Sequence, residues 1–391
     1  MPESVKHCTS LYVSAGRELA HYDVQVDAAA LVKRAPVQLP CKVQYVWPHP
    51  AAPFLYAACS DGSAEARGAK HCVVALRRDA ATGALSFHGE PVALAARPIH
   101  ITADIPGEHL LIAYNNPSTV TVHRINPDGG VGAQVTQRIY PDTGIYAHQV
   151  RVAPSNRMVI VVARGNDAKA GTAEDPGALK VFDYAHGQLT LRASVAPGGG
   201  YGFGPRHLDF HPSRPWVYAS LERQNTLHMF ALRDDSLEPA PSYVKGTLAD
   251  QPGMRRRQRP GTIHMHPNGR YAYVANRASG TAPVEGQQLY IGGENNIAVF
   301  AIDSASGEPT AIQHVDTHGI VPRTFALDAS GRLLVAANSV TILAREGGAV
   351  TTIPTSLAVF RVGDHGKLRY VRKYDIDAGE HAVFWMGIVT R

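Results

Sequence analysis

The stretch "GPRHLDFHPSRPWVYASLE", residues 204–222, has the pattern of a β-hairpin. Apolar residues recur on either side of the turn "PSRP", which is typical of two antiparallel strands that are joined tightly. The open end of this hairpin carries Arg206 and His207 on one strand and Glu222 on the other. A sheet does not need charge at that place, so these three residues are candidates for a functional site.

The same hairpin pattern recurs along the chain. Six copies are separated by 56, 48, 58, 55 and 62 residues when they are anchored on their turn residues, which are Pro50, Pro106, Pro154, Pro212, Pro267 and Ala329. A third apolar strand follows the hairpin, as in "TLHMFAL", "NIAVFAI" and "SLAVFRV", and then come a polar turn and a weaker fourth strand. Each interval therefore fits one four-stranded antiparallel sheet.

The chain ends supply one further copy, which is divided between them. The terminal "AVFWMGIV" reads as a first strand without its partner, and "SLYVSAG" and "LAHYDV" near the start read as a second and a third strand. Segments near 9–27 and 381–389 are thus expected to share one sheet. We predict an all-β, seven-bladed β-propeller with four-stranded antiparallel blades, closed by the N- and C-terminal strands, with residues 1–391 as a single domain.

Composition limits the location and the partners of this protein. Apolar residues make up 45% of the chain, but no run approaches the roughly 18 residues of a membrane span. The start "MPESVKHCTSLYV" lacks the pattern of a secretory signal, which predicts a cytoplasmic protein without a membrane partner. The four cysteines, Cys8, Cys41, Cys59 and Cys72, have no metal-ligand spacing and are expected to be reduced, structural thiols.

The net charge of +5 is modest for a chain of 391 residues. The one dense basic run, "MRRRQRP" at 254–260, contains no aromatic residues on which bases could stack. We interpret it as a solvated loop and predict no nucleic-acid partner. Homo-oligomer formation is left open by the sequence.

The mouth of the predicted channel gathers ionisable residues. First strands line the channel of a propeller and second strands return antiparallel to them, so the open ends of the hairpins meet around one mouth. Equivalent positions at these ends are held by Gln44, His100, His148, Arg206, Gly261 and Arg323 on first strands and by Ser60, Asn116, Arg164, Glu222, Arg277 and Ser339 after second strands. Crowded arginines repel one another unless a carboxylate or a bound anion offsets them. Long connections leave from the same mouth, which predicts a deep, partly lidded pocket.

The chain resembles the seven-bladed propeller lactonases, a family that includes bacterial 6-phosphogluconolactonases and fungal 3-carboxy-cis,cis-muconate lactonising enzymes. The resemblance rests on Gly-Pro-Arg-His with a Glu sixteen residues after the Arg, and on "HQVRVAPSNR", "VPRTFALDASGRLLVAAN" and the Trp near the C-terminus. It implies that His148, Arg206, Glu222 and Arg277 are catalytic, and it implies no metal or cofactor. The sequence departs from the family pattern in the segment "ARGNDAKAGTAEDPGA" and in long insertions after Arg277 and Asn338, so the substrate cannot be transferred directly.

Opening a lactone requires a base for the attacking water and positive groups where the oxyanion develops. Glu222 and His148 are both candidate bases, and Arg206 and Arg277 can offset the charge or clamp an anionic group. We assign substrate binding to His100, Arg164, His207, Asn276 and Arg323. Asn276 has a second interpretation, shared with Asn115 and Asn338, as a residue that caps a loop.

The sequence therefore predicts a metal-independent lactone hydrolase that acts on a small, anionic sugar or dicarboxylic acid lactone. A muconate-type lactonising cycloisomerase, whose substrate is a dicarboxylate, is the first alternative, and a propeller that serves only as a binding scaffold is the second. A metal site across neighbouring blades, formed by His207 with His211 or by His264 with His266, is a weaker possibility, because alternate strand residues that face one side are more often channel-lining or hydrogen-bonded histidines.

Overall fold

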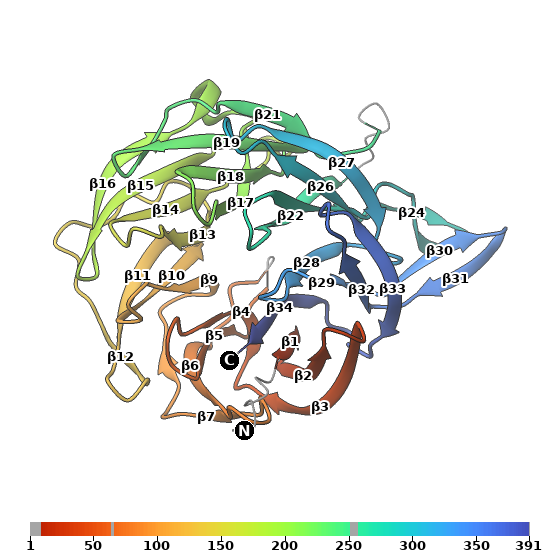
Figure 1. Ribbon diagram of the computed structural model, residues 1–391, viewed down its shortest axis with the longest axis horizontal. Helices are drawn as coiled ribbons and strands as arrows, with labels where there is room; N and C mark the ends of the chain where they lie inside the picture. The colour runs from red at the N-terminus through yellow and green to blue at the C-terminus, as the bar shows by residue number, and fades with distance from the viewer. Residues whose placement is uncertain (1–8, 64–65, 251–256, 391) are drawn as a thin grey trace.

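The computed structural model describes residues 9–63, 66–250 and 257–390. These residues form seven antiparallel sheets arranged as blades around a central channel, as Figure 1 shows in a view along the channel. No α-helix occurs among them, and no segment that could span a membrane as a helix is found in the described ranges. The predicted seven-bladed propeller is confirmed.

We number the blades from the first complete one. Blade 1 contains β4 (Lys42–Pro48), β5 (Phe54–Ser60), β6 (His71–Arg78) and, in two short pieces, β7 (Leu85–Phe87) and β8 (Val92–Ala93). Blade 2 contains β9 (Pro98–Ala103), β10 (His109–Asn115), β11 (Ser118–Ile125) and β12 (Val131–Gln134). Blade 3 contains β13 (Ala147–Val152), β14 (Met158–Ala163), β15 (Ala178–Ala185) and β16 (Gln188–Val195).

The remaining blades have the same plan. Blade 4 contains β17 (Pro205–Phe210), β18 (Trp216–Leu221), β19 (Thr226–Arg233) and an outer strand in two pieces, β20 (Ser236–Leu237) and β21 (Tyr243–Gly246). Blade 5 contains β22 (Gln258–Met265), β23 (Tyr271–Ala278), β26 (Asn296–Ile302) and β27 (Pro309–Asp316), and blade 6 contains β28 (Pro322–Leu327), β29 (Leu333–Asn338), β32 (Ser356–Val362) and β33 (Leu368–Asp375).

Blade 7 closes the ring with strands from both chain ends. Its innermost strand is β34 (Val383–Thr390), which pairs with β1 (Thr9–Ala15), followed by β2 (Glu18–Gln25) and β3 (Ala30–Gln38). Leu11 lies opposite Ile388 in this register. The prediction that the two ends share one blade is confirmed.

The apolar core is divided among the seven junctions between blades. Each of the seven clusters of buried apolar residues draws its members from two neighbouring blades. For example, Val181 and Ile160 of blade 3 pack with Leu208 and Val217 of blade 4. Both faces of a blade are covered in this way, which explains why its inner strands are apolar at nearly every position.

An eighth sheet was not predicted. The insertions after Arg277 and Asn338 each fold into a hairpin, and these hairpins are β24 (Thr281–Val284) with β25 (Gln287–Tyr290), and β30 (Ile342–Glu346) with β31 (Ala349–Ile353). They join through a parallel contact between Leu289 and Leu343. The sheet projects from the rim of the disc beside blades 5 and 6 (Figure 1). The expectation that these two insertions would help to lid the channel is therefore wrong.

The innermost strands carry a β-bulge near the mouth. In blade 4, Pro205 pairs with Leu221 and His207 with Ser220, so Arg206 is the extra residue. The extra residue is His148 in blade 3, Arg323 in blade 6 and Gln44 in blade 1. Bulges re-aim a side chain out of the regular alternation. This repeated irregularity places the candidate residues of different blades around one mouth.

Candidate functional site

The carboxylate of Glu222 lies at the centre of an arginine cluster. Its Oε1 lies 2.8 Å from Nε of Arg206 and also contacts Nη2 of Arg277. Its Oε2 accepts a hydrogen bond of 2.6 Å from Nε of Arg164. These residues come from blades 3, 4 and 5, and the exposed fraction of the Glu222 side chain is 5%. The predicted residues Arg164, Arg206, Glu222 and Arg277 therefore meet in one buried group.

The charge state of this group follows from its surroundings. Burial raises the pKa of Glu222, but Arg277, Arg206 and Arg164 outweigh burial and hold the pKa well below its usual range. Burial and the charge of Arg277 lower the pKa of Arg206. Glu222 is thus a carboxylate near neutral pH, and guanidinium groups contact both of its oxygens. A carboxylate in that state is a poor proton acceptor.

A second acidic residue extends the cluster toward solvent. Asp167 Oδ2 accepts hydrogen bonds of 2.9 Å from both Arg164 and Arg259, and its Oδ1 accepts one of 3.0 Å from Arg223. Glu174 Oε1 accepts another hydrogen bond of 2.6 Å from Arg223. The loop that carries Asp167 and Glu174 thus covers one side of the Glu222 group. It supplies acidic side chains from the segment in which the sequence departs from the family pattern.

Sequence reasoning missed Arg259, Arg223, Asp167 and Glu174 as members of this network. Residues 254–256 of the basic run lie outside the described residues, but residues 258–260 begin β22, so the interpretation of the whole run as a solvated loop is wrong. Arg259 lies opposite Arg277 in the pairing of β22 with β23. The register of β22 against β23 is the signal that could have identified Arg259 as a site residue, because this register places Arg259 at the mouth.

Three histidines line the channel beneath the arginines. The ring centroids of His148 and His207 are 5.1 Å apart, and those of His207 and His100 are 6.3 Å apart. Burial, and then the charge of Arg206, lowers the pKa of His148 and of His207 well below 6.5. For His100, burial and the charge of Arg151 act in the same direction. All three rings are therefore neutral imidazoles near neutral pH.

The position of His100 differs from the predicted one. In blade 2 the bulged residue is Ile99, because Pro98 pairs with Tyr114 and His100 with Ala113. His100 thus occupies the position that His207 occupies in blade 4, one residue deeper in the channel. The error comes from the turn residue on which this repeat was aligned. Pro106 is the third residue of its turn, whereas Pro212 is the second, so counting back from Pro106 ends one residue too far along the strand. Neither ring nitrogen of His100 has a hydrogen-bond partner among the described residues.

Arg323 forms the other side of the mouth. Its guanidinium carbon lies 4.0 Å from the ring centroid of Phe384, and its Nε donates to the Phe384 carbonyl at 3.4 Å. No carboxylate forms an ion pair with Arg323 within the described part of the chain. Burial and the charge of Arg277 lower its pKa to about 9. Arg323 therefore presents a positive charge that no acidic side chain contacts directly.

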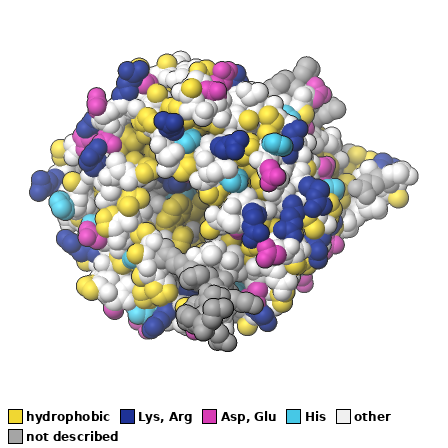
Figure 2. Space-filling model, in the orientation of Figure 1, with side chains coloured by type: hydrophobic (Ala, Val, Ile, Leu, Met, Phe, Trp, Pro, Cys, Tyr) yellow, Lys and Arg dark blue, Asp and Glu magenta, His cyan; other side chains and the backbone are white. Residues whose placement is uncertain are grey.

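A narrow cavity of about 10 Å³, which is room for about one water molecule, lies between these side chains. Its lining includes His148, Arg206, His207, Thr262, Arg323 and Phe384. Tyr146 stacks beside His148 with 6.2 Å between ring centroids, and it also lies under the guanidinium of Arg164 at 5.5 Å. Figure 2 shows one face of the molecule, which is hollowed near its centre, with hydrophobic side chains in the hollow and charged side chains around it.

Asn276 lies within its blade. Its Nδ2 donates hydrogen bonds to the Thr247 carbonyl at 2.6 Å and to Oδ1 of Asn296 at 2.8 Å. Asn338 has equivalent partners, the Thr317 carbonyl and Oγ of Ser356. The repeated arrangement supports the interpretation of these residues as caps and not the assignment of Asn276 to substrate binding.

The suspected histidine pairs do not form metal sites. His211 Nε2 bonds to the Gly269 carbonyl at 2.9 Å, and its Nδ1 accepts from backbone amides of the same turn. His266 uses its two nitrogens in the same way, with the Gly331 carbonyl at 3.0 Å. Because both ring nitrogens are engaged, neither residue can complete a pair with His207 or His264.

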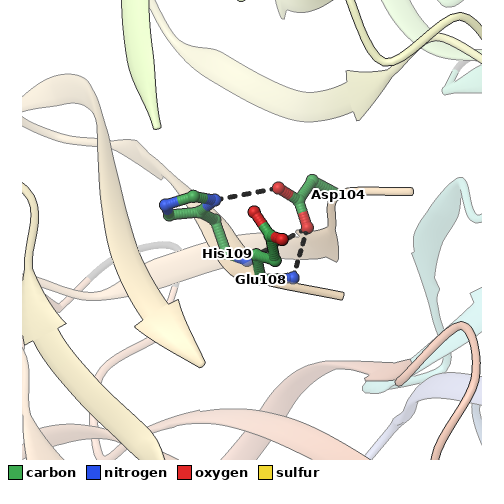
Figure 3. A group of neighbouring side chains, drawn as sticks. All are labelled: Asp104, Glu108 and His109. Atoms are coloured by element: carbon green, nitrogen blue, oxygen red, sulfur yellow. Dashed lines mark hydrogen bonds and ion pairs between the residues drawn. The ribbon is translucent and has the colours of Figure 1, made fainter. Parts of the chain in front are cut away.

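Another group of potential ligands, Asp104, Glu108 and His109, lies at the turn between β9 and β10 (Figure 3). Asp104 Oδ2 contacts Nδ1 of His109 at 2.9 Å and accepts a hydrogen bond of 3.0 Å from the Tyr184 hydroxyl. Its Oδ1 accepts the backbone amides of Glu108 and His109. Tyr184 belongs to blade 3, so this carboxylate joins two blades. Its contacts are those of a structural residue.

The structure is a seven-bladed propeller whose ionisable groups gather at one end of the channel. Comparison with known proteins identifies the family. The family described as "Lactonase, 7-bladed beta-propeller" matches residues 5–359, and the chain belongs to it. The prediction of a lactone-hydrolysing enzyme is confirmed at this level.

Named relatives and solved structures agree with the family. The chain is 31% identical over 277 residues to a 6-phosphogluconolactonase of Cronobacter sakazakii, which covers 68% of this chain and 70% of that protein. It is 26% identical over 302 residues to a 6-phosphogluconolactonase of Bacillus subtilis, with 73% and 78% covered. The structure of a periplasmic gluconolactonase from Pseudomonas aeruginosa superposes with a TM-score of 0.72 at 20% identity, covering 97% of this chain and 99% of that one. This last similarity concerns the fold.

Proposed function

We propose that this protein hydrolyses the lactone of an anionic sugar acid and that its reaction occurs at the mouth of the channel, beside His148, Arg206 and Arg323. The observation that carries the proposal is the buried Glu222 carboxylate, which holds three arginines beside a neutral histidine. The mouth also retains the unpaired charge of Arg323, which favours an anionic substrate. The named relatives that hydrolyse a phosphorylated sugar lactone support the same substrate class.

His148 is the proposed general base. It is neutral because its pKa is low, and its Nδ1 is buried without a hydrogen-bond partner among the described residues. Glu222 is less suited to this role, because guanidinium groups contact both of its oxygens. Its proposed role is to position Arg164, Arg206 and Arg277 and to offset part of their charge.

The proposed reaction has two proton transfers. His148 accepts a proton from water while the water oxygen bonds to the lactone carbonyl carbon, and the carbonyl becomes an oxyanion near Arg206 and Arg323. The ring C–O bond then breaks, and the imidazolium of His148 returns the proton to the departing alkoxide. The product is the open hydroxy acid, and the enzyme regains its starting state.

A muconate-type cycloisomerase is less well supported, because the named relatives cited above are lactone hydrolases. The two reactions are separated by one experiment on the whole chain. A panel of aldonolactones is followed by proton release, and a panel of muconates by loss of ultraviolet absorbance. Proton release that saturates with lactone concentration supports the proposal. Turnover of muconates alone overturns it, and binding of both panels without turnover supports a scaffold.

The cytoplasmic location stays a prediction. One structural neighbour is named as periplasmic, so the fold does not decide the compartment. Fractionation of cells that express the native gene tests this point.

A further inference from the structure

A cavity of about 260 Å³ lies at the opposite end of the channel from the charged mouth, where the innermost strands end. Its wall is formed by β4, β22, β28 and β34, which belong to blades 1, 5, 6 and 7. Tyr45 and Thr324 line both this cavity and the narrow cavity beside His148, so these two residues lie between the cavities. An apolar cavity of roughly 150 Å³ accepts benzene. The cavity at this end is therefore large enough for one small aromatic molecule.

The wall of this cavity is apolar and partly aromatic. Its large apolar side chains are Trp47, Met265, Leu327, Trp385, Met386 and Ile388. No lysine or arginine belongs to the described residues that line it, and the one acidic residue, Asp328, accepts hydrogen bonds on both oxygens from its own turn. Burial raises the pKa of Tyr45 to about 12, so its hydroxyl is uncharged. This composition is the opposite of that at the mouth, where arginines surround a carboxylate.

Trp385 brings a hydrogen-bond donor to this cavity. Its side chain is buried, and its indole N–H donates to no residue within the described ranges. A buried indole N–H usually has an acceptor. The backbone of Trp385 is held by Ser14, whose Oγ accepts the Trp385 amide at 2.9 Å and donates to the Trp385 carbonyl at 3.1 Å. The ring is thus fixed in the wall, and an oxygen atom of a ligand can accept its open N–H.

The two indoles are positioned by their neighbours. A Cβ added at Gly387 would lie 2.6 Å from Cζ2 and 2.8 Å from Cη2 of Trp385. The backbone of Gly387 is not in the left-handed region, so the close approach of the indole, and not the backbone conformation, requires a glycine there. On Trp47, the guanidinium carbon of Arg151 lies 5.2 Å from the ring centroid, and Arg151 is held by Asp209 at 2.9 Å. Rings that are already in place lose little freedom when a ligand binds.

We propose that this cavity is a second binding site, which takes a small, uncharged aromatic compound with an oxygen acceptor, of the class of a phenol. The aromatic ring is buried against Trp47 and Trp385, and its oxygen accepts the indole N–H of Trp385. An anionic or cationic ligand is disfavoured, because its charge would be buried without a partner of opposite sign. The site is separate from the proposed reaction at the mouth, and binding at this end of the channel does not require that reaction.

The test titrates p-cresol into the full chain by calorimetry at neutral pH. We expect saturable binding of one molecule per chain. Toluene, which has the same ring without the oxygen, should bind about 5-fold more weakly, because one hydrogen bond is lost. The charged analogues p-toluate and p-methylbenzylammonium should each bind about 10-fold more weakly or less. If either charged analogue binds as tightly as p-cresol, the assignment to an uncharged ligand is overturned.

Two variants place the binding in this cavity. Gly387→Ala pushes a methyl group against the indole of Trp385 and should weaken p-cresol binding about 10-fold. Ala329→Leu, at an exposed position of the lining, narrows the cavity without changing the core and should weaken binding as well. The matched control is Gly363→Ala on the exposed turn after β32, where an added Cβ meets no atom closer than 3.5 Å.

The outcomes of this test do not depend on lactone turnover. Binding that weakens in both cavity variants, while the melting temperature of Ala329→Leu stays that of the wild type, supports the site even if no lactone is hydrolysed. The site is overturned if p-cresol does not bind saturably, or if it binds equally well to Gly387→Ala, Ala329→Leu and the wild type. A dimer in light scattering that Ala329→Leu dissociates, without p-cresol binding, would assign this surface to a second copy of the chain and overturn the proposal.

Discussion

The two ends of the inner hairpins use the same residue type in opposite ways. At the turn end, His49, His211 and His266 bond through Nε2 to the carbonyls of Gly107, Gly269 and Gly331 in the next blade, and their Nδ1 atoms accept backbone amides. At the mouth, Nδ1 of His148 and both nitrogens of His100 are buried without partners among the described residues. A histidine with both nitrogens engaged joins blades, whereas one without partners is available to a ligand.

The carboxylates follow the same division. Asp104 at a turn is contacted by backbone amides, the Tyr184 hydroxyl and the His109 imidazole, and Glu222 at the mouth is surrounded by guanidinium groups. The first arrangement joins two blades, and the second holds charges where a substrate can enter. The comparison therefore predicts that substitutions at the turns will lower stability and leave catalysis unchanged, whereas substitutions at the mouth will lower catalysis.

The largest effect is expected from Glu222→Gln. Loss of the carboxylate leaves Arg164, Arg206 and Arg277 close together without their counter-charge, so kcat should fall on the order of 10²-fold or more. The free energy of unfolding should also fall, by about 3 kcal/mol, because the acidic partner is removed and its basic partners stay buried without it. Activity assays and chemical denaturation measure the two effects. Glu308→Gln is the control, since it removes the surface partner of Lys245 and should cost less than about 1 kcal/mol.

His148→Asn and His211→Asn form a matched pair that tests the division directly. The first should lower kcat about 10²-fold, as expected for loss of a general base, and leave the melting temperature nearly unchanged. The second should leave kcat unchanged and lower the free energy of unfolding by about 1 kcal/mol, because it removes a bond between blades. If His148→Asn instead remains active but melts several degrees earlier, His148 belongs with the structural histidines.

The pH dependence of kcat/KM sharpens the assignment of the base. Burial and Arg206 hold the pKa of His148 well below 6.5, so the neutral form persists when the pH falls below that value. We therefore expect kcat/KM to be flat from neutral pH to below pH 6 and to fall only in more acid solution. Arg206→Gln removes a positive neighbour and should move the acid limb to higher pH. An acid limb that does not move with Arg206→Gln would assign it to another group.

The smallest expected effect is on the stability of the fold in acid solution, to which the Asp209 carboxyl contributes. Burial raises the pKa of Asp209, but Arg151 and His264 outweigh it and lower the pKa to about 2. A carboxyl with a lower pKa in the folded state stabilises the fold above its unfolded pKa and loses that contribution as the pH falls through its folded pKa. Unfolding curves from about pH 4 to about pH 2 should therefore be less pH-dependent in Asp209→Asn than in the wild type. The exposed Glu90→Gln is the control, and an unchanged slope in Asp209→Asn would contradict the expectation.

The sequence by itself determined the ring and the residues at its mouth. Apolar alternation and regular turn spacing are local properties, so six repeats and one divided repeat predicted seven blades and the closure by β34 and β1. The equivalence of Arg206, His148 and Arg323 followed from counting along the repeats, and the shared β-bulge confirms it. Counting along the repeats misplaced His100, because the turn between β9 and β10 has its proline one residue later than the other turns.

Only the tertiary structure decided which of these residues touch and what their charge states are. Glu222 contacts Arg164 and Arg277 from two other blades, and Asp167 accepts a hydrogen bond from Arg259, which is 92 residues away in the sequence, so no local pattern could predict these contacts. The low pKa of Glu222 and that of His148 depend on burial and on neighbours from other blades, which exist only after the ring closes. The pairing of β25 with β30 has the same origin, since two insertions became neighbours only because blades 5 and 6 are adjacent.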